Sequence, residues 1–478
     1  MFADNSKECK KDADSDVSDG KSFLQQIAKA RTAKDSCATV RPSSLMEEIA
    51  SPQNLASALL QVARNHGAPG ADGITTKEIL QAAPRLLESL RADLLSGRYR
   101  PGDIRRVEIP KPGGGTRALG IPDVRDRWVQ QAAQQVLATL FEPEFHNSSH
   151  GFRPNRGATT AVAEAKEHLN GGCNWVVGID LSKFFDRVNH QRLLAKLART
   201  ISDKSVLKMI HLMLKARIVL PNGTRANTEE GVPQGGPLSP LLSNIVLDEL
   251  DWEMHRRNLK FVRYADDFNV YVASERAGLR VMATLTSFIE RRLRLKVNLE
   301  KSEVSPPGQV HLLGFSLTKG KEGAIEVRPS KRTQERMRVR IRELTPRNWG
   351  GTLETCFEQA NTYLKGWSGY FKLCTYECKR TLNTFDAHLR RRIRAIIVKQ
   401  KKKPKFLFKH LIQRGVKAKA AAQAALRACG IWNKSNAPGL TQAYRNHWFT
   451  GRLTNLWEEW QRLNPPTPVV NIQLLLEF

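Results

Sequence analysis

Hydrophobic residues recur every three or four positions over much of this chain, and in a few short stretches they alternate with polar residues. The first spacing predicts amphipathic helices, and the second predicts half-buried strands. No segment repeats another. Helical spacing covers residues 43–95, 126–141, 193–216, 241–254, 279–293, 330–344, 353–371, 382–398 and 418–429, and a further helix is expected through Val162 and Ala165.

Strand patterns lie between the helices and are bounded by turn residues. Residues 105–122 predict two strands around Gly113–Gly115, and 217–227 predict a hairpin that turns at Asn222–Gly223, a strong hairpin signal. Single strands are expected over 174–180, 297–302 and 311–317. The pattern therefore predicts a chain that mixes helices with short strands.

The stretch from Phe261 to Val272 is the most informative of these patterns. It places Asp266 and Asp267 side by side at the tip of a tight hairpin, with alternating apolar and aromatic residues on both sides. Aspartate is common in solvated turns, and taken alone the pair favours that reading. Carboxylates beside a β core otherwise need a partner, because burying an unpaired charge is costly, and the usual partner is a divalent metal ion.

The charge of the chain points to a polyanionic partner. Its 478 residues carry 76 Lys and Arg against 47 acids, a net charge of +29, and 41% of them are hydrophobic. This length allows about three domains. Nucleic acid is the first candidate partner for such an excess, ahead of a membrane surface or a merely basic soluble protein.

Neither end of the chain nor its cysteines suggests export. The start has no apolar signal segment, no stretch is long and apolar enough to cross a bilayer, and we expect residues 1–20 to be disordered. The seven cysteines are scattered, and Cys374 and Cys378 have no second pair to complete a zinc site. A reducing, intracellular location without membrane contact is predicted.

Three carboxylates are expected to meet at one edge of a sheet. Asp180 ends the apolar strand 174–180, and Asp266 and Asp267 lie in the hairpin. If these strands are neighbours, the oxygen ligands suit two Mg²⁺ ions, and the backbone carbonyl of Leu181 can add another ligand. Two such metals stabilise the attacking and leaving oxygens of an in-line displacement.

Two cations flank the predicted glycine turn of residues 105–122. Lys111 and Arg117 would lie near the tip of this hairpin, where they could hold a triphosphate. A solvated hairpin explains the same residues, and this stretch alone favours it.

With these features the sequence resembles the reverse transcriptases, and more narrowly the proteins encoded by bacterial group II introns. The resemblance covers about residues 60–400 and rests on several motifs in a fixed order. These motifs are Leu119–Pro122, Gly151–Pro154, Asp180–Asp186, Gly231–Leu242, Arg263–Asp267 and Leu313–Phe315.

The resemblance implies an α+β fold, a right-hand polymerase followed by a helical thumb and a mostly helical maturase domain. By this analogy residues 1–42 form a disordered or extended segment, 43–328 the fingers and palm, 329–400 the thumb, and 401–478 the RNA-binding maturase region. The absence of paired Cys-x-x-Cys motifs after Cys378 leads us to expect no C-terminal endonuclease.

The resemblance also implies roles for single residues. Asp180 and Asp266 would be the main Mg²⁺ ligands, with Asp267 at the same centre and Mn²⁺ able to substitute. Phe185 would exclude a 2′-OH and so select dNTPs. The remaining roles concern the nucleotide and the primer: Gln234 and Gly235 frame the incoming dNTP, Lys111 and Arg117 hold its triphosphate, and Leu313–Phe315 position the primer terminus.

The implied function is RNA-directed DNA synthesis, with binding of the intron RNA to assist splicing and retrohoming of the mobile element. The partners would be intron RNA, an RNA template with a DNA primer or target DNA, and dNTPs, in a bacterial cytoplasm in association with the nucleoid or a ribonucleoprotein. Two alternatives remain: an RNA-binding splicing factor whose polymerase role is secondary, and a domesticated relative used in DNA repair or defence.

Overall fold

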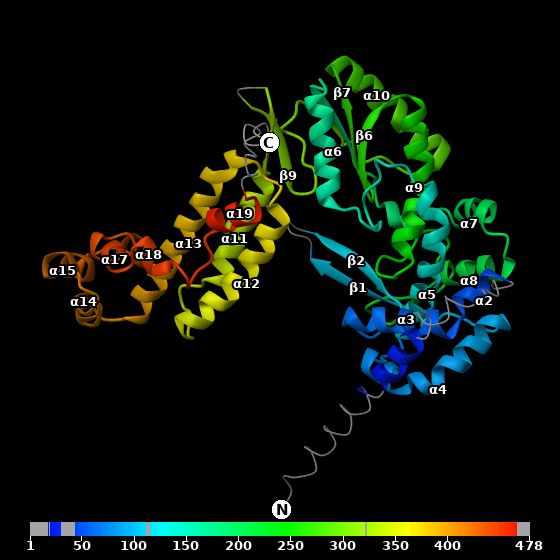
Figure 1. The fold of residues 1–478 in the computed structure, drawn as a ribbon, viewed down its shortest axis with the longest axis horizontal. Helices are drawn as coiled ribbons and strands as arrows, with labels where there is room; N and C mark the ends of the chain where they lie inside the picture. The colour runs from blue at the N-terminus through cyan, green and yellow to red at the C-terminus, as the bar shows by residue number, and fades with distance from the viewer. Residues whose placement is uncertain (1–17, 19, 30–43, 111–114, 321–322, 466–478) are drawn as a thin grey trace, which may run out of the picture. The chain divides into compact units, whose positions relative to one another are not determined.

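The computed structural model describes residues 18, 20–29, 44–110, 115–320 and 323–465. The chain divides into two compact units, the first formed by residues 1–168 and 173–305 and the second by 169–172 and 306–478 (Figure 1). Lys111 and residues 1–17, 19 and 30–42 of the predicted N-terminal segment lie outside the described residues. Residues 20–29 are helical and bury Leu24 in the core, so the prediction of a disordered or extended segment is wrong for them. The first unit ends before the expected palm boundary at residue 328, and the four-part domain division remains a prediction.

Helices make up most of the first unit, as the hydrophobic spacing predicts. Their starts are set by caps: Ser51 caps α3, and Thr75 forms a capping box with Glu78 in α4. The helices are α2 (Leu45–Ile49), α3 (Pro52–Arg64), α4 (Thr76–Leu95), α5 (Val124–Phe141), α6 (Ala158–Asn170), α7 (His190–Thr200), α8 (Lys204–Leu214), α9 (Ser239–Arg256) and α10 (Glu275–Phe288), which continues as a π-helix over Ile289–Leu293.

One helix prediction was too long. The segment 193–216 contains two helices, because the Asp203 side chain accepts a hydrogen bond from the Ser205 N–H and starts α8 afresh.

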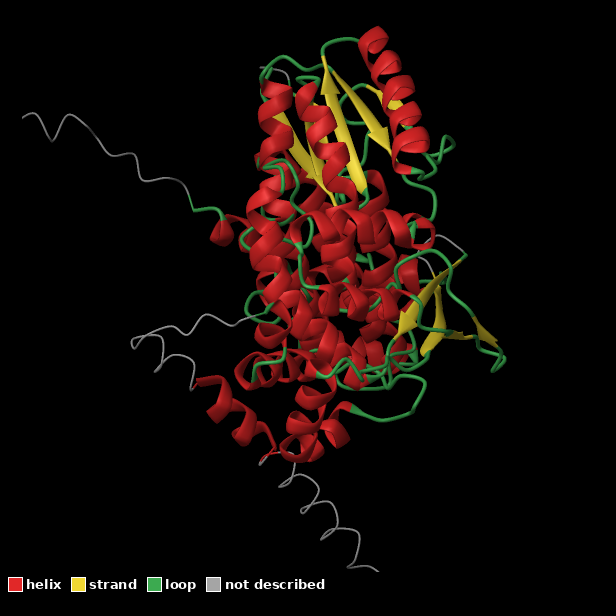
Figure 2. Ribbon diagram, turned by 90° about the vertical axis from the view of Figure 1, so that its right-hand side faces the viewer, coloured by secondary structure: helices red, strands yellow, loops and turns green. Residues whose placement is uncertain are grey.

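The central sheet of the first unit has the strand order β6-β7-β3-β8. Its strands are β3 (Trp175–Ile179), β6 (Lys260–Tyr264), β7 (Asp267–Val272) and β8 (Glu303–Ser305), and every neighbouring pair is antiparallel. Helix α10 packs on this sheet at Gly278, where an added Cβ would lie 2.5 Å from Val304. Figure 2 shows helices lying alongside the strands of this sheet. The strands predicted for 174–180 and 261–272 are confirmed.

A second sheet holds both other predicted hairpins. Its order is β2-β1-β4-β5, from β1 (Ile104–Pro110), β2 (Thr116–Ile121), β4 (Ile218–Val219) and β5 (Arg225–Ala226). The predicted turn is present, with Gly223 at φ 82° and the Thr224 N–H donating to the Asn222 side chain over 3.1 Å.

Two strand predictions need correction. Residues 297–302 contain a single β-bridge at Val297 and a turn over 299–301, and the strand β8 begins only at Glu303. The strand expected over 311–317 instead starts at Phe315 as β9 (Phe315–Lys319), after a turn at Leu313 and Gly314 in which both residues have positive φ.

The second unit is mostly helical. Apart from the pair β9 and β10 (Ile325–Pro329), its core is formed by long helices that bury residues such as Leu364, Phe385 and Ile393. None of the helices described in either unit is both long and apolar enough to cross a membrane. The helices are α11 (Lys331–Leu344), α12 (Leu353–Phe371), α13 (Lys379–Gln400), α14 (Pro404–Gln413), α15 (Ala418–Leu426), α16 (Ile431–Lys434), α17 (Pro438–Ala443), α18 (Asn446–Phe449) and α19 (Leu456–Leu463).

Candidate active site

Strand pairing brings the three predicted carboxylates to one edge of the central sheet. Strands β3 and β7 are antiparallel neighbours, with Ile179 opposite Phe268. Asp180, which follows Ile179, therefore lies across from Asp267 at the start of β7. Asp266 belongs to the two-residue turn that joins β6 to β7, next to this point. Residues more than 80 positions apart in the chain thus form one acidic edge.

The hairpin turn has the tight geometry that places Asp266 at its tip. Ala265 has φ 57°, the left-handed conformation that the favoured two-residue hairpin turns require. The turn is backed by Gly151, whose added Cβ would lie 2.4 Å from the Ala265 nitrogen. A side chain at position 151 would therefore displace the turn, which explains the glycine in the Gly151–Pro154 motif.

A buried arginine fixes the hairpin from behind. The Arg263 side chain, 0% exposed, forms an ion pair with the equally buried Asp251, with Nη2 and Oδ2 2.6 Å apart. Its guanidinium also donates to the Ala265 carbonyl oxygen over 3.0 Å and to the Asn244 side chain over 3.0 Å. The Ser149 hydroxyl accepts a further bond over 2.7 Å. We call Arg263, Asp251, Asn244 and Ser149 the Arg263 network.

Sequence reasoning missed the Arg263 network, although its signals were present. Arg263 occupies a position in β6 whose neighbours are apolar, where a charge needs a partner. Asn244 and Asp251 are seven residues apart in α9, and both are buried on the helix face that also carries Leu247. Polar residues on the apolar face of a helix, near an arginine in a strand, would have indicated the pairing.

Asp266 and Asp267 lie in a setting that disfavours their charged forms. Burial raises the pKa of Asp266, with the Asp180 charge adding to the rise. Part of the Asp267 side chain is exposed, but it is largely surrounded by protein. This burial, together with the charges of Asp266 and Asp180, raises the pKa of Asp267 to about 6. Lys301 and Arg117 act in the opposite direction. The three acids therefore repel one another, and a cation bound among them would relieve this.

This repulsion predicts that Asp267→Asn stabilises the metal-free protein at neutral pH. The folded pKa of about 6 exceeds the unfolded value of about 3.9, so the folded state binds the proton more tightly. Stability is then highest below the unfolded pKa and falls as pH rises through the window between the two values. Urea unfolding of both proteins in EDTA should show the variant with the higher midpoint at pH 7.5 and a smaller difference at pH 4. An equal midpoint at pH 7.5 would contradict the predicted repulsion.

Residues 297–302, for which a strand was predicted, hydrogen-bond to the backbone of Asp180. The Asn298 N–H donates to the Asp180 carbonyl oxygen over 2.8 Å, and the Asp180 N–H donates to the Ser302 hydroxyl over 3.1 Å. The turn thus fixes the Asp180 backbone and brings Lys301 toward Asp267. Leu181, the predicted backbone ligand, follows Asp180 and forms an isolated bridge to Val297.

A metal ion fits this edge by the chemistry of its donors. The carboxylates offer the oxygen ligands that hard divalent cations prefer, and they lower the stability of one another's charged form. Within the described part of the chain, no three His, Cys, Asp or Glu side chains are already grouped as a complete metal site. The assignment of Asp180, Leu181, Asp266 and Asp267 as ligands therefore remains a prediction.

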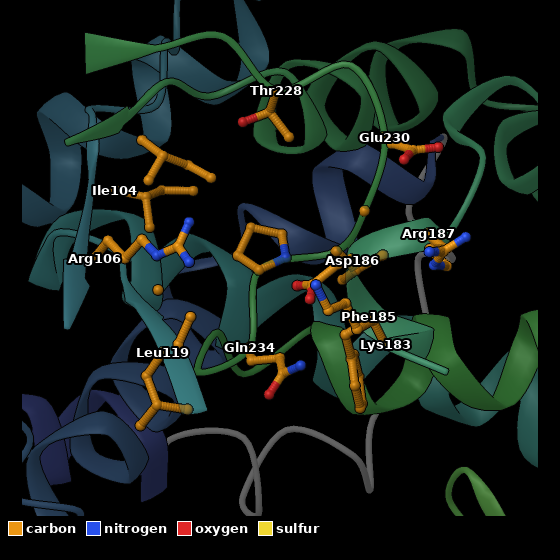
Figure 3. Close-up of a pocket in the computed structure, with 16 residues that line it drawn as sticks. Ile104, Arg106, Leu119, Lys183, Phe185, Asp186, Arg187, Thr228, Glu230 and Gln234 are labelled. Atoms are coloured by element: carbon orange, nitrogen blue, oxygen red, sulfur yellow. The ribbon is translucent and has the colours of Figure 1, made fainter. Parts of the chain in front are cut away.

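A cavity of about 470 Å³ contains two of the predicted nucleotide-binding residues. Phe185 and Gln234 both line it, together with Asp186, Lys183 and others from β1, β2 and β4 (Figure 3). The Gln234 side chain accepts a hydrogen bond from the Arg117 Nε over 2.8 Å. Arg117, on the exposed end of β2, is thus adjacent to Gln234, while Lys111 lies outside the described residues.

Backbone hydrogen bonds hold the Gln234 loop against its neighbours. The Val232 N–H donates to the Phe185 carbonyl oxygen, and the Gly120 N–H donates to the Gln234 carbonyl oxygen over 2.9 Å. Gly235 has φ 133°, and an added Cβ would lie 2.5 Å from the Gly120 oxygen. Glycine is therefore needed at position 235 for backbone reasons alone.

Comparisons with known proteins place this site in a defined domain. Residues 109–317, which include all three carboxylates, match the family described as reverse transcriptase (RNA-dependent DNA polymerase). Residues 334–415 match the group II intron, maturase-specific domain. Both matches follow the order of domains that the sequence motifs implied.

Individual relatives agree with these matches. Protein YkfC of Escherichia coli is 35% identical over 308 residues, which cover 56% of this chain and 80% of YkfC. Group II intron-encoded protein LtrA of Lactococcus lactis is 29% identical over 322 residues, 54% of this chain and 52% of LtrA. A putative COX1/OXI3 intron 2 protein of Saccharomyces cerevisiae is 34% identical over 205 residues, 43% of this chain and 23% of that protein. The chain thus matches about half of LtrA and less than a quarter of the yeast protein.

Proposed function

Because the chain belongs to the group II intron family of reverse transcriptases and maturases, we propose that it copies RNA into DNA at the acidic edge of its central sheet. The family and the α+β class were both predicted from the sequence and are confirmed. The observation that carries the proposal is the pairing of β3 with β7, which brings Asp180 to the Asp266–Asp267 hairpin inside the matched reverse transcriptase domain.

Reverse transcriptases generally use divalent metal ions. We propose that the metal here is Mg²⁺ and that its ligands are Asp180, Asp266, Asp267 and the Leu181 carbonyl. Bound in pairs, such ions stabilise the charge on the attacking and leaving oxygens of nucleotidyl transfer. The carboxylates supply the negative charge that holds the cations. The Arg263 network keeps the hairpin in place, so that Asp266 needs no rearrangement before substrate binds.

The residues around the 470 Å³ cavity suit an incoming dNTP. Arg117 provides a cation beside Gln234. Its charge partly offsets the rise in the pKa of Asp266 and of Asp267, so it lies near both carboxylates. We propose that Arg117, with Lys111, binds the triphosphate, and that Gln234 and Gly235 frame the nucleotide. Phe185 is 8% exposed and packs edge-on against Phe184, with ring centroids 5.1 Å apart, so its ring has little freedom to move away from a 2′-OH.

Phe185→Ala is expected to relax the choice of sugar. A smaller side chain leaves room for a 2′-OH, and the ratio of kcat/KM for a dNTP to that for the matching rNTP should fall by about tenfold or more. Single-nucleotide addition to a DNA primer on an RNA template measures this ratio. Ile218→Ala, which enlarges the same cavity from β4, is the matched control and should leave the ratio within about twofold. A ratio unchanged in Phe185→Ala would remove the residue from sugar selection.

The maturase-specific domain supports RNA binding. We propose that the RNA is a group II intron. The protein would assist the splicing of this intron and then copy it into DNA during retrohoming. Several features support this partner. The chain carries a net charge of +29, and α11 and α13 are rich in arginine. Phosphate contacts from such residues supply most of the affinity for nucleic acid.

Splicing and polymerisation should be separable. We expect Asp180→Asn to retain most of its effect on splicing of a cognate intron RNA while it loses DNA synthesis, because RNA binding uses the basic surfaces and not the acidic edge. Splicing assays at low Mg²⁺, with and without the protein, test this on the same preparation. Loss of both activities in a variant that still binds the RNA would show that the two functions share the site.

A further inference from the structure

The second unit contains a polar cavity of about 510 Å³ that the proposed polymerase site does not use. It is formed by residues of α13, α18 and α19 and the segment before α19. Its volume lies in the range of about 300–1,000 Å³ in which proteins bind small ligands. Phe449 contributes an apolar side chain to its lining. Its polar and charged lining includes Asn383, Asp386, Arg390, Asn446, Asn455 and Glu458.

Asp386 gives this cavity a specific chemical requirement. The residue is 3% exposed, and its Oδ1 accepts a hydrogen bond from the Leu456 N–H over 3.0 Å at the start of α19. Its Oδ2 is also buried but has no hydrogen-bond partner among the described residues. Burial, with the charge of Glu458 adding to it, raises the pKa of this carboxyl to about 6, although the backbone N–H groups of Leu456 and Trp457 and the charge of Arg390 act in the opposite direction. A buried acceptor left unpaired is costly, so a ligand that donates an N–H group would be stabilised here.

The charges of the chain favour RNA over a protein as the source of that donor. A lysine or arginine of a partner protein could pair with Asp386 and Glu458, but it would meet Arg390 in the same cavity and would have to approach a chain whose net charge is +29. A nucleobase instead supplies neutral N–H donors on a strand whose phosphates this charge attracts. Single-stranded RNA is commonly recognised through unstacked bases that enter such pockets and bond along their Watson–Crick edges.

Among the four bases, guanine matches a carboxylate best. A carboxylate can only accept hydrogen bonds. Guanine presents two adjacent donors, N1–H and the N2 amino group, whereas the donors of adenine, cytosine and uracil each stand beside an acceptor that a carboxylate would repel. We propose that this cavity binds an unpaired guanine of the bound RNA, with Asp386 Oδ2 accepting from the guanine edge. The proposal rests on the RNA binding proposed above and adds a base preference to it.

Short uridine oligoribonucleotides with one central substitution test the preference on the full-length protein. Fluorescence anisotropy should show the guanosine oligomer binding about tenfold tighter than the adenosine or all-uridine oligomers, the discrimination of one well-formed base contact. Inosine, which lacks the N2 amino group, should lie between them if both donors are used. Equal affinity for the guanosine and adenosine oligomers would overturn the proposal without any variant being needed.

Asp386→Asn then assigns the preference to this side chain. Asparagine keeps one oxygen for the Leu456 N–H but presents an N–H₂ group in place of the other, so the guanosine preference should vanish while all-uridine binding stays unchanged. Glu459→Gln is the control on α19, because that carboxylate pairs with Arg462 over 2.6 Å and does not line the cavity. A preference that persists in Asp386→Asn would overturn the assignment.

The same measurements separate this inference from the proposed function. If the wild-type protein binds none of the oligomers, the RNA-binding function fails. If it binds all of them equally, only the guanine site fails. An oligolysine peptide that competes with RNA in the wild type but not in Asp386→Asn, without any base preference, would assign the cavity to a protein partner and overturn the proposal.

Discussion

Asp266→Asn should lower the rate of DNA synthesis on an RNA template by about three orders of magnitude, because a metal's stabilisation of transition-state charge is worth several kcal/mol. The substitution keeps the size of the side chain but removes the charge that holds the cation. The fold should persist, since the turn is held by Arg263 and Gly151 and not by the Asp266 side chain. Primer extension under single-turnover conditions measures the rate.

Glu275→Gln is the matched control for this experiment. It neutralises an exposed carboxylate in the first turn of α10, which follows the end of β7 opposite to Asp267, and should leave the rate within about twofold, since exposed charges distant from a reaction have small effects. A rate for Asp266→Asn within tenfold of the wild type would remove Asp266 from the catalytic centre.

Arg263→Met should have the largest effect on stability, lowering the free energy of unfolding by about 3–5 kcal/mol. Both partners of its ion pair are 0% exposed, so the variant leaves the Asp251 carboxylate buried without its cation. It also leaves the Ala265 carbonyl and the Ser149 hydroxyl without their donor. Urea unfolding, with the slope of the transition checked against the wild type, gives the value.

Two further variants distinguish a buried pair from a general charge effect. Arg292→Met breaks the exposed pair with Glu249, where the arginine is 66% exposed, and should cost at most about 1 kcal/mol. The double variant Arg263→Met/Asp251→Leu removes both buried charges and should recover part of the lost stability. DNA synthesis should stay low in it, because the Ala265 carbonyl then lacks the guanidinium donor that fixes it. A single variant Arg263→Met that loses less than about 1 kcal/mol would show that the pair does not hold the hairpin.

The catalytic edge could be predicted because its signals are local. Alternation around Asp266 and Asp267 defines a hairpin, and an apolar run that ends at Asp180 defines a strand. Each pattern depends on a few consecutive residues, and both strands are present in the structure. The sequence alone leaves the pairing of β3 with β7 as a hypothesis, and the register of Ile179 with Phe268 supports it.

What could not be predicted depends on contacts between distant segments. The segment 297–302 alternates apolar and polar residues at Val297 and Leu299 as a strand does. Its pairing with the sheet stops at the single bridge of Val297 to Leu181, and the Asn298 N–H and the Ser302 hydroxyl bond to the Asp180 backbone instead. The Arg263 network joins residues from a loop, a helix and a strand, and no local pattern shows that they meet. In the same way, Arg117 lies in a hairpin whose sequence alone favours a solvated hairpin, and its bond to Gln234 relates it to the cavity.

The central claim is that Asp180 and Asp266, 86 positions apart in the chain, act as one metal-dependent centre. Its most direct test is the rate of single deoxynucleotide addition on an RNA template during a Mg²⁺ titration, for the wild type, Asp180→Asn, Asp266→Asn and the double variant. We expect no addition by the wild type without a divalent metal, and a similar large loss in each single variant. The double variant should be no slower than either, as for residues that act as a unit. Addition in EDTA, or losses that multiply in the double variant, would contradict a shared centre.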